Sequence, residues 1–161
     1  MIVLCVLAAA SSAAGAATTS KPSKSHRQIP SITNATNLSK EPVIHADKAK
    51  PPSKVLTKDL VEGTGTAVGT TSLVTVKYVG ADYATGKDFT ATTWKSGRAA
   101  TFSLAKVVAG FAAGLVGMKV GGRREIVIPP KYGYGDTAVG PIKANETLVF
   151  VVDLVGVSSG S

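Results

Sequence analysis

Cysteine and histidine are nearly absent from this 161-residue chain, and their positions exclude several kinds of chemistry. The only cysteine, Cys5, lies in an apolar N-terminal stretch, so a chain that has lost this stretch can form no disulfide and use no thiol nucleophile. The two histidines, His26 and His45, precede the predicted folded region, which therefore has neither a Ser-His-Asp arrangement nor a histidine-ligated metal site. No metal and no cofactor is expected.

Aromatic residues are absent before Tyr78, since all nine lie between Tyr78 and Phe150. Residues 1–17 are apolar and rich in small side chains, and they resemble a secretory signal that is too short to span a bilayer. Residues 18–54 have no aromatic and no sustained hydrophobic period, which predicts a flexible tether. One folded domain is then expected at residues 55–157, with a short tail at 158–161. The leader predicts an exported protein, whether secreted, periplasmic or in the cell envelope.

Positive charge is concentrated in the predicted tether. Of the net charge of +8, residues 1–54 contribute seven Lys/Arg against two acids, and residues 55–161 contribute eleven against eight. Because the basic residues and the aromatic residues are largely apart, the pattern argues against a nucleic-acid binder. The charge predicts one electrostatic partner, an anionic surface that the basic tether would contact weakly.

Alternating hydrophobic residues predict an antiparallel sheet. Val74, Val76 and Tyr78 have the period-2 pattern of a half-buried strand, whereas residues 148–154 are apolar on both faces and predict a central strand. A helical face is present only in residues 106–116, a short segment that must pack on the sheet to be stable. The predicted fold class is α+β, an antiparallel sheet with one short helix laid on it.

A proline-terminated strand followed by a glycine-rich loop predicts a binding site. Pro129 and Pro130 must end the strand, which leaves Tyr132 and Tyr134 on a loop where their rings can face a small apolar group. The carboxylates show no paired motif, and the glycine runs are turns rather than phosphate-binding loops. Rotation about an X-Pro bond is a reaction that such a site can catalyse, because it needs apolar surroundings for a twisted amide and no nucleophile.

Residues 55–157 resemble the FKBP-type peptidyl-prolyl cis-trans isomerases. The resemblance implies a curved antiparallel sheet wrapped around one short α-helix, rotamase activity on X-Pro bonds, and binding of macrolides of the FK506 and rapamycin type. Combined with the leader, it predicts that the clients are exported proteins. It rests on the number, order and spacing of seven motifs, which are Asp59-Leu60-Val61-Glu62-Gly63-Thr64-Gly65, Val74-Thr75-Val76-Lys77-Tyr78-Val79-Gly80, Gly86-Lys87-Asp88-Phe89, Val107-Val108-Ala109-Gly110-Phe111, Gly114-Leu115-Val116-Gly117-Met118-Lys119-Val120-Gly121-Gly122, Ile128-Pro129-Pro130-Lys131-Tyr132-Gly133-Tyr134-Gly135 and Thr147-Leu148-Val149-Phe150.

The resemblance also implies a proline pocket, position by position. Phe111 would form its floor, and the hydroxyl of Tyr134 would donate a hydrogen bond to the carbonyl of the ligand. We interpret Trp94 and Phe102 as packing residues with no role in the pocket. The implied catalytic residues are Tyr78, Phe89, Phe111, Tyr134 and Phe150, and the implied substrate-binding residues are Val107, Val108 and Ile142.

Three positions depart from the family pattern and leave other functions open. Thr90 replaces a common aspartate, Ala100 stands where many members have a pocket phenylalanine, and Phe111 replaces a frequent tryptophan. The first two changes remove a polar contact and widen the pocket, which would suit a proline-binding chaperone or adaptor with little turnover. The short loop at residues 136–144 is expected to alter the preference for the residue before proline. In a third interpretation, the domain is only a spacer in a tethered, wall-associated protein.

Overall fold

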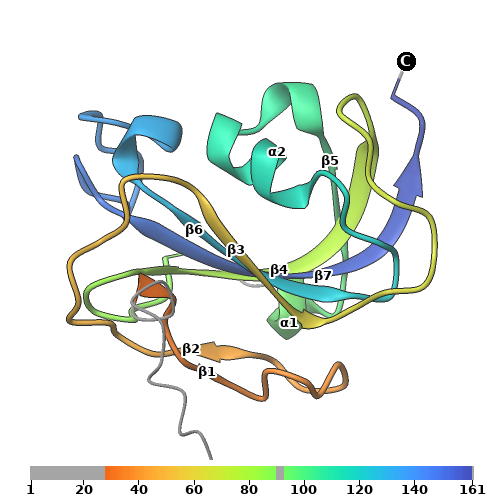
Figure 1. Ribbon diagram of the computed structural model, residues 1–161, viewed down its shortest axis with the longest axis horizontal. Helices are drawn as coiled ribbons and strands as arrows, with labels where there is room; N and C mark the ends of the chain where they lie inside the picture. The colour runs from red at the N-terminus through yellow and green to blue at the C-terminus, as the bar shows by residue number, and fades with distance from the viewer. Residues whose placement is uncertain (1–27, 90–92, 161) are drawn as a thin grey trace, which may run out of the picture.

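A five-stranded antiparallel sheet forms the centre of the computed structural model, which describes residues 28–89 and 93–160 (Figure 1). The strands lie in the order β3-β6-β7-β4-β5, and every neighbouring pair is antiparallel. This arrangement confirms the predicted α+β class. The strand bounds are β3 (Leu56–Val61), β4 (Leu73–Asp82), β5 (Ala100–Ser103), β6 (Arg123–Ile128) and β7 (Leu148–Ser158).

One face of the sheet, here the helix face, is covered by α2 (Ala109–Leu115), around which the strands curve (Figure 1). This seven-residue helix contains two poor helix formers, Gly110 and Gly114, and close packing on the sheet explains why they are tolerated. A Cβ atom at either glycine would overlap the side chains of Ile128 or Ile126 on β6, so the helix packs closer to the sheet than alanine would permit. The other helical turns are α1 (Thr93–Ser96) and the 3₁₀ helices η2 (Leu104–Lys106) and η3 (Pro130–Tyr132).

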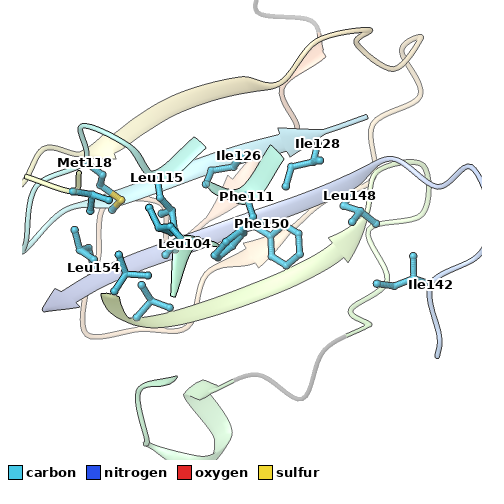
Figure 2. Close-up of a cluster of buried hydrophobic side chains, with 14 residues drawn as sticks. Leu104, Phe111, Leu115, Met118, Ile126, Ile128, Ile142, Leu148, Phe150 and Leu154 are labelled. Atoms are coloured by element: carbon cyan, nitrogen blue, oxygen red, sulfur yellow. The ribbon is translucent and has the colours of Figure 1, made fainter. Parts of the chain in front are cut away.

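The central strand β7 is buried on both faces, as its sequence predicts. Phe150 and Leu154 belong to the core on the helix face, together with Phe111 and Leu115 of α2 (Figure 2). Val149 and Val151 belong to a separate cluster on the opposite face. Since both clusters are buried, the second face of the sheet must also be covered by part of the chain.

Residues 28–54, which we call the N-terminal cover, lie over this second face, here the cover face (Figure 1). The prediction of a flexible tether is wrong for this segment: β1 (Ile32–Thr33) pairs antiparallel with β2 (Val43–Ile44), and Ile44 is buried against the sheet. The reason is tertiary, because a few isolated isoleucines gain enough burial from the apolar face of β6 and β7 to order a segment with no hydrophobic period. The predicted leader and residues 18–27 of the predicted tether lie outside the described residues.

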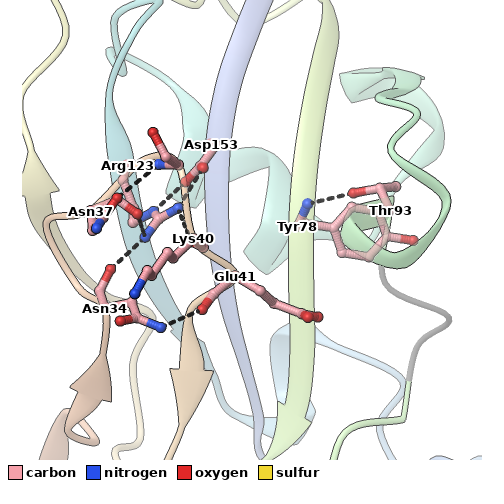
Figure 3. Close-up of polar contacts among 9 residues, drawn as sticks. Asn34, Asn37, Lys40, Glu41, Tyr78, Thr93, Arg123 and Asp153 are labelled. Atoms are coloured by element: carbon pink, nitrogen blue, oxygen red, sulfur yellow. Dashed lines mark hydrogen bonds and ion pairs between the residues drawn. The ribbon is translucent and has the colours of Figure 1, made fainter.

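Arg123 of β6 fastens the cover to the sheet from within (Figure 3). Its guanidinium is fully buried and donates two hydrogen bonds to the carboxylate of Asp153, from Nε at 2.5 Å and from Nη2 at 2.7 Å. The remaining donors reach carbonyl oxygens of the cover: Nη1 bonds Asn34 and Asn37 at 2.6 and 3.1 Å, and Nη2 bonds Lys40 at 3.1 Å. A buried guanidinium is stable here because its charge is paired and each nitrogen has acceptors.

Candidate functional site

A pocket of about 350 Å³ opens beside α2 on the helix face. Its walls come from β4, β5, β7 and α2, and from the loops around them. The structure brings all eight predicted site residues together in this one pocket, although they are spread over more than seventy positions of the sequence. The full lining consists of Tyr78, Phe89, Phe102, Lys106, Val107, Val108, Phe111, Tyr134, Ile142 and Phe150.

A cluster of five aromatic rings gives the pocket its shape. Phe150 is central: its ring centroid lies 5.1 Å from that of Phe111, 5.7 Å from Phe89 and 6.3 Å from Tyr78, at tilted or edge-to-face angles. Phe102 completes the cluster at 5.8 Å from Tyr78 and 6.3 Å from Phe111. Edge-to-face contacts of this kind fix the rings against one another, so the cavity is largely formed before any ligand enters.

Gly80 on β4 makes room for two of these rings. It is the register partner of Phe150 on β7, and a Cβ atom at this position would lie 2.7 Å from the Phe150 ring and 3.0 Å from the Phe89 ring. Any side chain at position 80 would therefore push the rings out of the pocket wall. The sequence places Tyr78 two residues earlier on the same strand, so one short segment supplies both a ring and the space for its neighbours.

The two tyrosines of the predicted aromatic loop separate into different environments. Tyr132 ends η3 and packs against the core, whereas Tyr134 lines the pocket and is 38% exposed. Burial, with a smaller contribution from nearby Tyr134, raises the pKa of Tyr78, so this hydroxyl keeps its proton at neutral pH. The site therefore offers hydroxyl donors at its edge and an apolar interior.

Phe102 and Lys106 line the pocket but were not predicted to do so. Phe102 was interpreted as packing only; it packs on Tyr78 and Phe111 and also faces the cavity. The alternation of Phe102 and Leu104 with polar neighbours just before Val107 is a strand signal that could have placed Phe102 on the same face. Trp94, by contrast, lies on the cover face near Lys77 and Arg123, away from the pocket.

A second hollow of about 340 Å³ adjoins the pocket at Phe89. Its lining includes Asp82, Asp88 and Glu146 together with two lysines, whereas Lys106 is the only charged one among the described residues that line the pocket. Burial raises the pKa of Asp88, with a further rise from Glu41 of the cover and an opposing effect of Lys95. The turn that carries Phe89 thus separates an apolar cavity from a charged one.

Comparison with known proteins places this geometry in a family. Residues 65–155 match the family described as FKBP-type peptidyl-prolyl cis-trans isomerase. The FK506-binding protein of Streptomyces anulatus is 40% identical over 121 residues, which cover 73% of this chain and 97% of that relative. The chain belongs to the FKBP-type peptidyl-prolyl cis-trans isomerase family.

Two longer proteins are also similar to this chain. The crystal structure of FkpA from Escherichia coli is 34% identical, with a TM-score of 0.62, and the match covers 66% of this chain and 49% of that chain. The outer membrane protein MIP of Legionella longbeachae is 36% identical over 124 residues, which cover 73% of this chain and 52% of that protein. In both cases the match spans about half of the longer protein.

The departures from the FKBP pattern fall in different places of the structure. Ala100 is half-buried on β5 opposite Val76 and does not line the pocket, whereas Phe102, two residues later on the same strand, does. Thr90 lies outside the described residues. Phe111 occupies the floor on α2, where it meets Phe150 and Phe102, so an aromatic floor is kept without tryptophan.

Proposed function

We propose that this FKBP-type isomerase binds proline in the aromatic pocket and catalyses rotation about the preceding X-Pro bond. The observation that carries the proposal is that the eight residues implied by the family resemblance line one cavity of about 350 Å³. A pyrrolidine ring is a small apolar group that would fit against the Phe111 floor, with the flanking peptide leaving through the open side near Tyr134. Clients are proline-containing polypeptides, and macrolides of the FK506 type are expected to compete for the same pocket.

The pocket can lower the barrier to rotation by differential binding. Rotation about a peptide bond must overcome roughly 18–20 kcal/mol, because the planar amide is stabilised by resonance. The twisted amide has lost this resonance, and its carbonyl is less polarised, so an apolar cavity stabilises it more than the planar form. In the proposed mechanism Tyr134 donates a hydrogen bond to the peptide carbonyl and orients it, while the rings exclude water. Neither step transfers a proton or forms a covalent bond.

A protease-coupled assay on a prolyl peptide tests this proposal. We expect micromolar protein to accelerate isomerisation above the spontaneous rate, and FK506 to abolish the acceleration. Val107→Asp places a charge in the pocket and should abolish both catalysis and FK506 binding, whereas Val116→Asp, on an exposed position just after α2, should change neither. Wild-type protein that neither accelerates the reaction nor binds FK506 would overturn the proposal.

The second candidate function is a proline-binding chaperone or adaptor with little turnover. It is favoured by the sequence departure at Thr90, which removes a carboxylate that many family members have. The expected loss of a ring at Ala100 does not support it, because Ala100 lies outside the pocket lining and Phe102 supplies a ring there. The same assay separates the two functions, because this candidate predicts saturable FK506 binding without acceleration. A spacer function would predict neither.

We also propose that the protein is exported, as the apolar leader at residues 1–17 suggests. One relative, the outer membrane protein MIP, has a name that places it outside the cytoplasm, which supports the proposal. Within residues 28–89 and 93–160, no helix has the length and apolar character needed to cross a bilayer. Fractionation of cells that express the full chain should recover it outside the cytoplasm, and a chain retained in the cytoplasm at full length would contradict the proposal.

A further inference from the structure

The pocket wall formed by Phe89 depends on a tight turn at the end of β4. The turn is closed by backbone hydrogen bonds from Gly86 to the carbonyl of Asp82 at 2.8 Å and from Asp82 to the carbonyl of Lys87 at 3.0 Å. Phe89 then returns to the strand, where its N–H bonds the carbonyl of Gly80 at 3.1 Å. The position of the Phe89 ring against Phe150 is therefore set by where this turn lies.

The N-terminal cover holds the same turn from the opposite side of the sheet. The N–H of Asp47 bonds the carbonyl of Tyr83 at 2.9 Å, and Nζ of Lys48 bonds the carbonyl of Ala84 at 3.2 Å. Gly86 lies so near the cover that a Cβ atom would come within 2.6 Å of the backbone nitrogen of Ala46. Because these contacts are so close, a shift of the cover would change the position of the turn.

Buried side chains lock this contact. Tyr83 is 1% exposed and belongs to the same cluster as Ile44 of β2. Its hydroxyl is buried and has no hydrogen-bond partner of good geometry among the described residues. Burial and, to a smaller extent, the nearby carboxylate of Asp47 raise the pKa of Tyr83 to about 12. Displacing Ile44 from this cluster would expose the Tyr83 ring and release the turn that leads to Phe89.

Tyr78, the neighbouring ring on β4, is connected to the cover by a second route. Its backbone N–H bonds Oγ1 of Thr93 at 2.9 Å, at the start of α1 (Figure 3). The next residue, Trp94, lies on the cover face and contacts two cations, with Lys77 Nζ 5.0 Å and Arg123 Cζ 5.5 Å from its ring centroid. Arg123 is the residue whose guanidinium binds three carbonyls of the cover.

We infer that the N-terminal cover is a positioning element for the proline pocket, which acts through the Tyr83 turn on Phe89 and through Arg123 and Trp94 on Tyr78. The inference rests on the proposed function of the pocket. The floor formed by Phe111 and Phe150 has its own support from α2 and β7, so undocking the cover loosens one wall and leaves the floor in place. The coupling is reciprocal: if docking of the cover raises the affinity of the pocket for a ligand by some factor, binding of that ligand favours the docked cover by the same factor.

The first test compares two neighbouring residues of β2. Ile44→Asp should undock the cover, because Ile44 is 3% exposed, whereas Val43→Asp should leave it docked, because Val43 is 49% exposed. Fluorescence of Trp94, the only tryptophan, reports undocking from beneath the cover. We expect the KM for a prolyl peptide and the Kd for FK506 to rise about 5-fold or more in Ile44→Asp, within the usual range of coupling, with kcat little changed. Ile44→Val should restore both.

The second test uses the unaltered protein, so it does not depend on how well a variant folds. FK506 should slow hydrogen exchange at His45 and Asp47, whose amides bond Ser31 and Tyr83, by a factor similar to the affinity change above. The amide of Gly65, which bonds Val120 near another part of the sheet, serves as the control and should change less. FK506 binding without slower exchange at His45 and Asp47, or an undocked Ile44→Asp variant with unchanged FK506 affinity, would overturn the inference. Failure of the unaltered protein to bind FK506 would instead refute the proposed pocket.

Discussion

The helix face of the sheet is covered by a single seven-residue helix and keeps an open hollow, whereas the cover face is closed by a long irregular segment and encloses ionisable groups. On the helix face the buried side chains are apolar, and aromatic rings surround the cavity. On the cover face Arg123 and Glu125 are almost completely inaccessible. The face with the proposed proline pocket is therefore chemically the simpler one, while the opposite face holds the polar contacts that fix the N-terminal cover to the sheet.

Glu125 is the least favourable feature of the cover face. Neither of its carboxylate oxygens has a hydrogen-bond partner among the described residues, and burial raises its pKa to about 8. Lys58, its register partner on β3, lowers the pKa, and Asp47 of the cover raises it further, but burial has the largest effect. The carboxyl group is therefore mostly protonated at neutral pH, in contrast to the fully paired Arg123 two residues earlier.

The largest effect is expected from removing the arginine that joins cover and sheet. Arg123→Met leaves Asp153 without its partner and three carbonyls of the cover without their donor, so the free energy of unfolding should fall by about 3–5 kcal/mol. Urea denaturation measures the change. Lys119→Met is the matched control, because its ion pair with Glu62 is exposed and 3.9 Å long, and it should cost less than about 1 kcal/mol. An equal decrease in the free energy of unfolding for the two variants would contradict the prediction that the buried ion pair contributes more to stability than the exposed one.

The next largest effect concerns the pH dependence of stability. Unfolding returns the pKa of Glu125 from about 8 toward its ordinary value of 4.5. Between these two pH values the unfolded chain therefore binds fewer protons than the folded protein. The free energy of unfolding should fall as the pH rises through this window and level off above it. Glu125→Gln removes this titration and should stabilise the protein by about 2 kcal/mol or more at pH 9, with little gain at pH 4. Urea titrations at several pH values measure the difference. Parallel pH curves for the two proteins would contradict the prediction.

A smaller effect is expected for the ring at the centre of the pocket. Phe150→Leu keeps an apolar residue on β7 but removes the contacts with Phe89, Phe111 and Tyr78, so stability should fall by about 1–2 kcal/mol and kcat/KM by roughly 10-fold. Thermal unfolding and the peptide assay measure the two quantities. Val155→Ala on the same strand is exposed and should change each only slightly. A loss of stability with full activity would remove Phe150 from the catalytic set.

The smallest effect is expected from a single hydroxyl. Tyr134→Phe keeps the ring at the pocket edge and removes the proposed donor, so kcat/KM should fall roughly 3- to 10-fold, the equivalent of one hydrogen bond, with stability nearly unchanged. Tyr132→Phe is the matched control, because Tyr132 packs against the core outside the pocket. If both variants lose the same activity, Tyr134 is not a specific donor.

The strands of the helix face could be predicted from local signals in the sequence, whereas the pocket residues were implied by the family resemblance. Alternation in β4 and β7, the prolines after β6 and the order of the motifs each depend on neighbouring residues, and the structure places the predicted pocket residues around one cavity. Phe102 was assigned only to packing because its strand, β5, is four residues long and shows a weak pattern. A single alternating pair of residues does not distinguish a core position from a pocket position.

The cover could not be predicted, because its stability is almost entirely non-local. Each of its strands is two residues long, and Ile32 and Ile44 are separated by polar residues and show no period. An indirect signal was present: Val149 and Val151 gave β7 a second apolar face, and an apolar face in a small protein requires a cover. This pattern places β7 in the middle of the sheet, but it does not identify the segment that buries the other side of the strand.

The position of β7 in chain order has a consequence for biosynthesis. β7 follows both of its partner strands in the sequence, and it is the only link between the β3-β6 pair and the β4-β5 pair of the sheet. A nascent chain that stops short of Leu148 therefore carries two separate strand pairs, each with an unsatisfied inner edge, and it cannot close its hydrophobic clusters. The sheet can therefore be completed only after Leu148–Ser158 has been synthesised, so the last strand in the chain is also the one that joins the two halves of the fold.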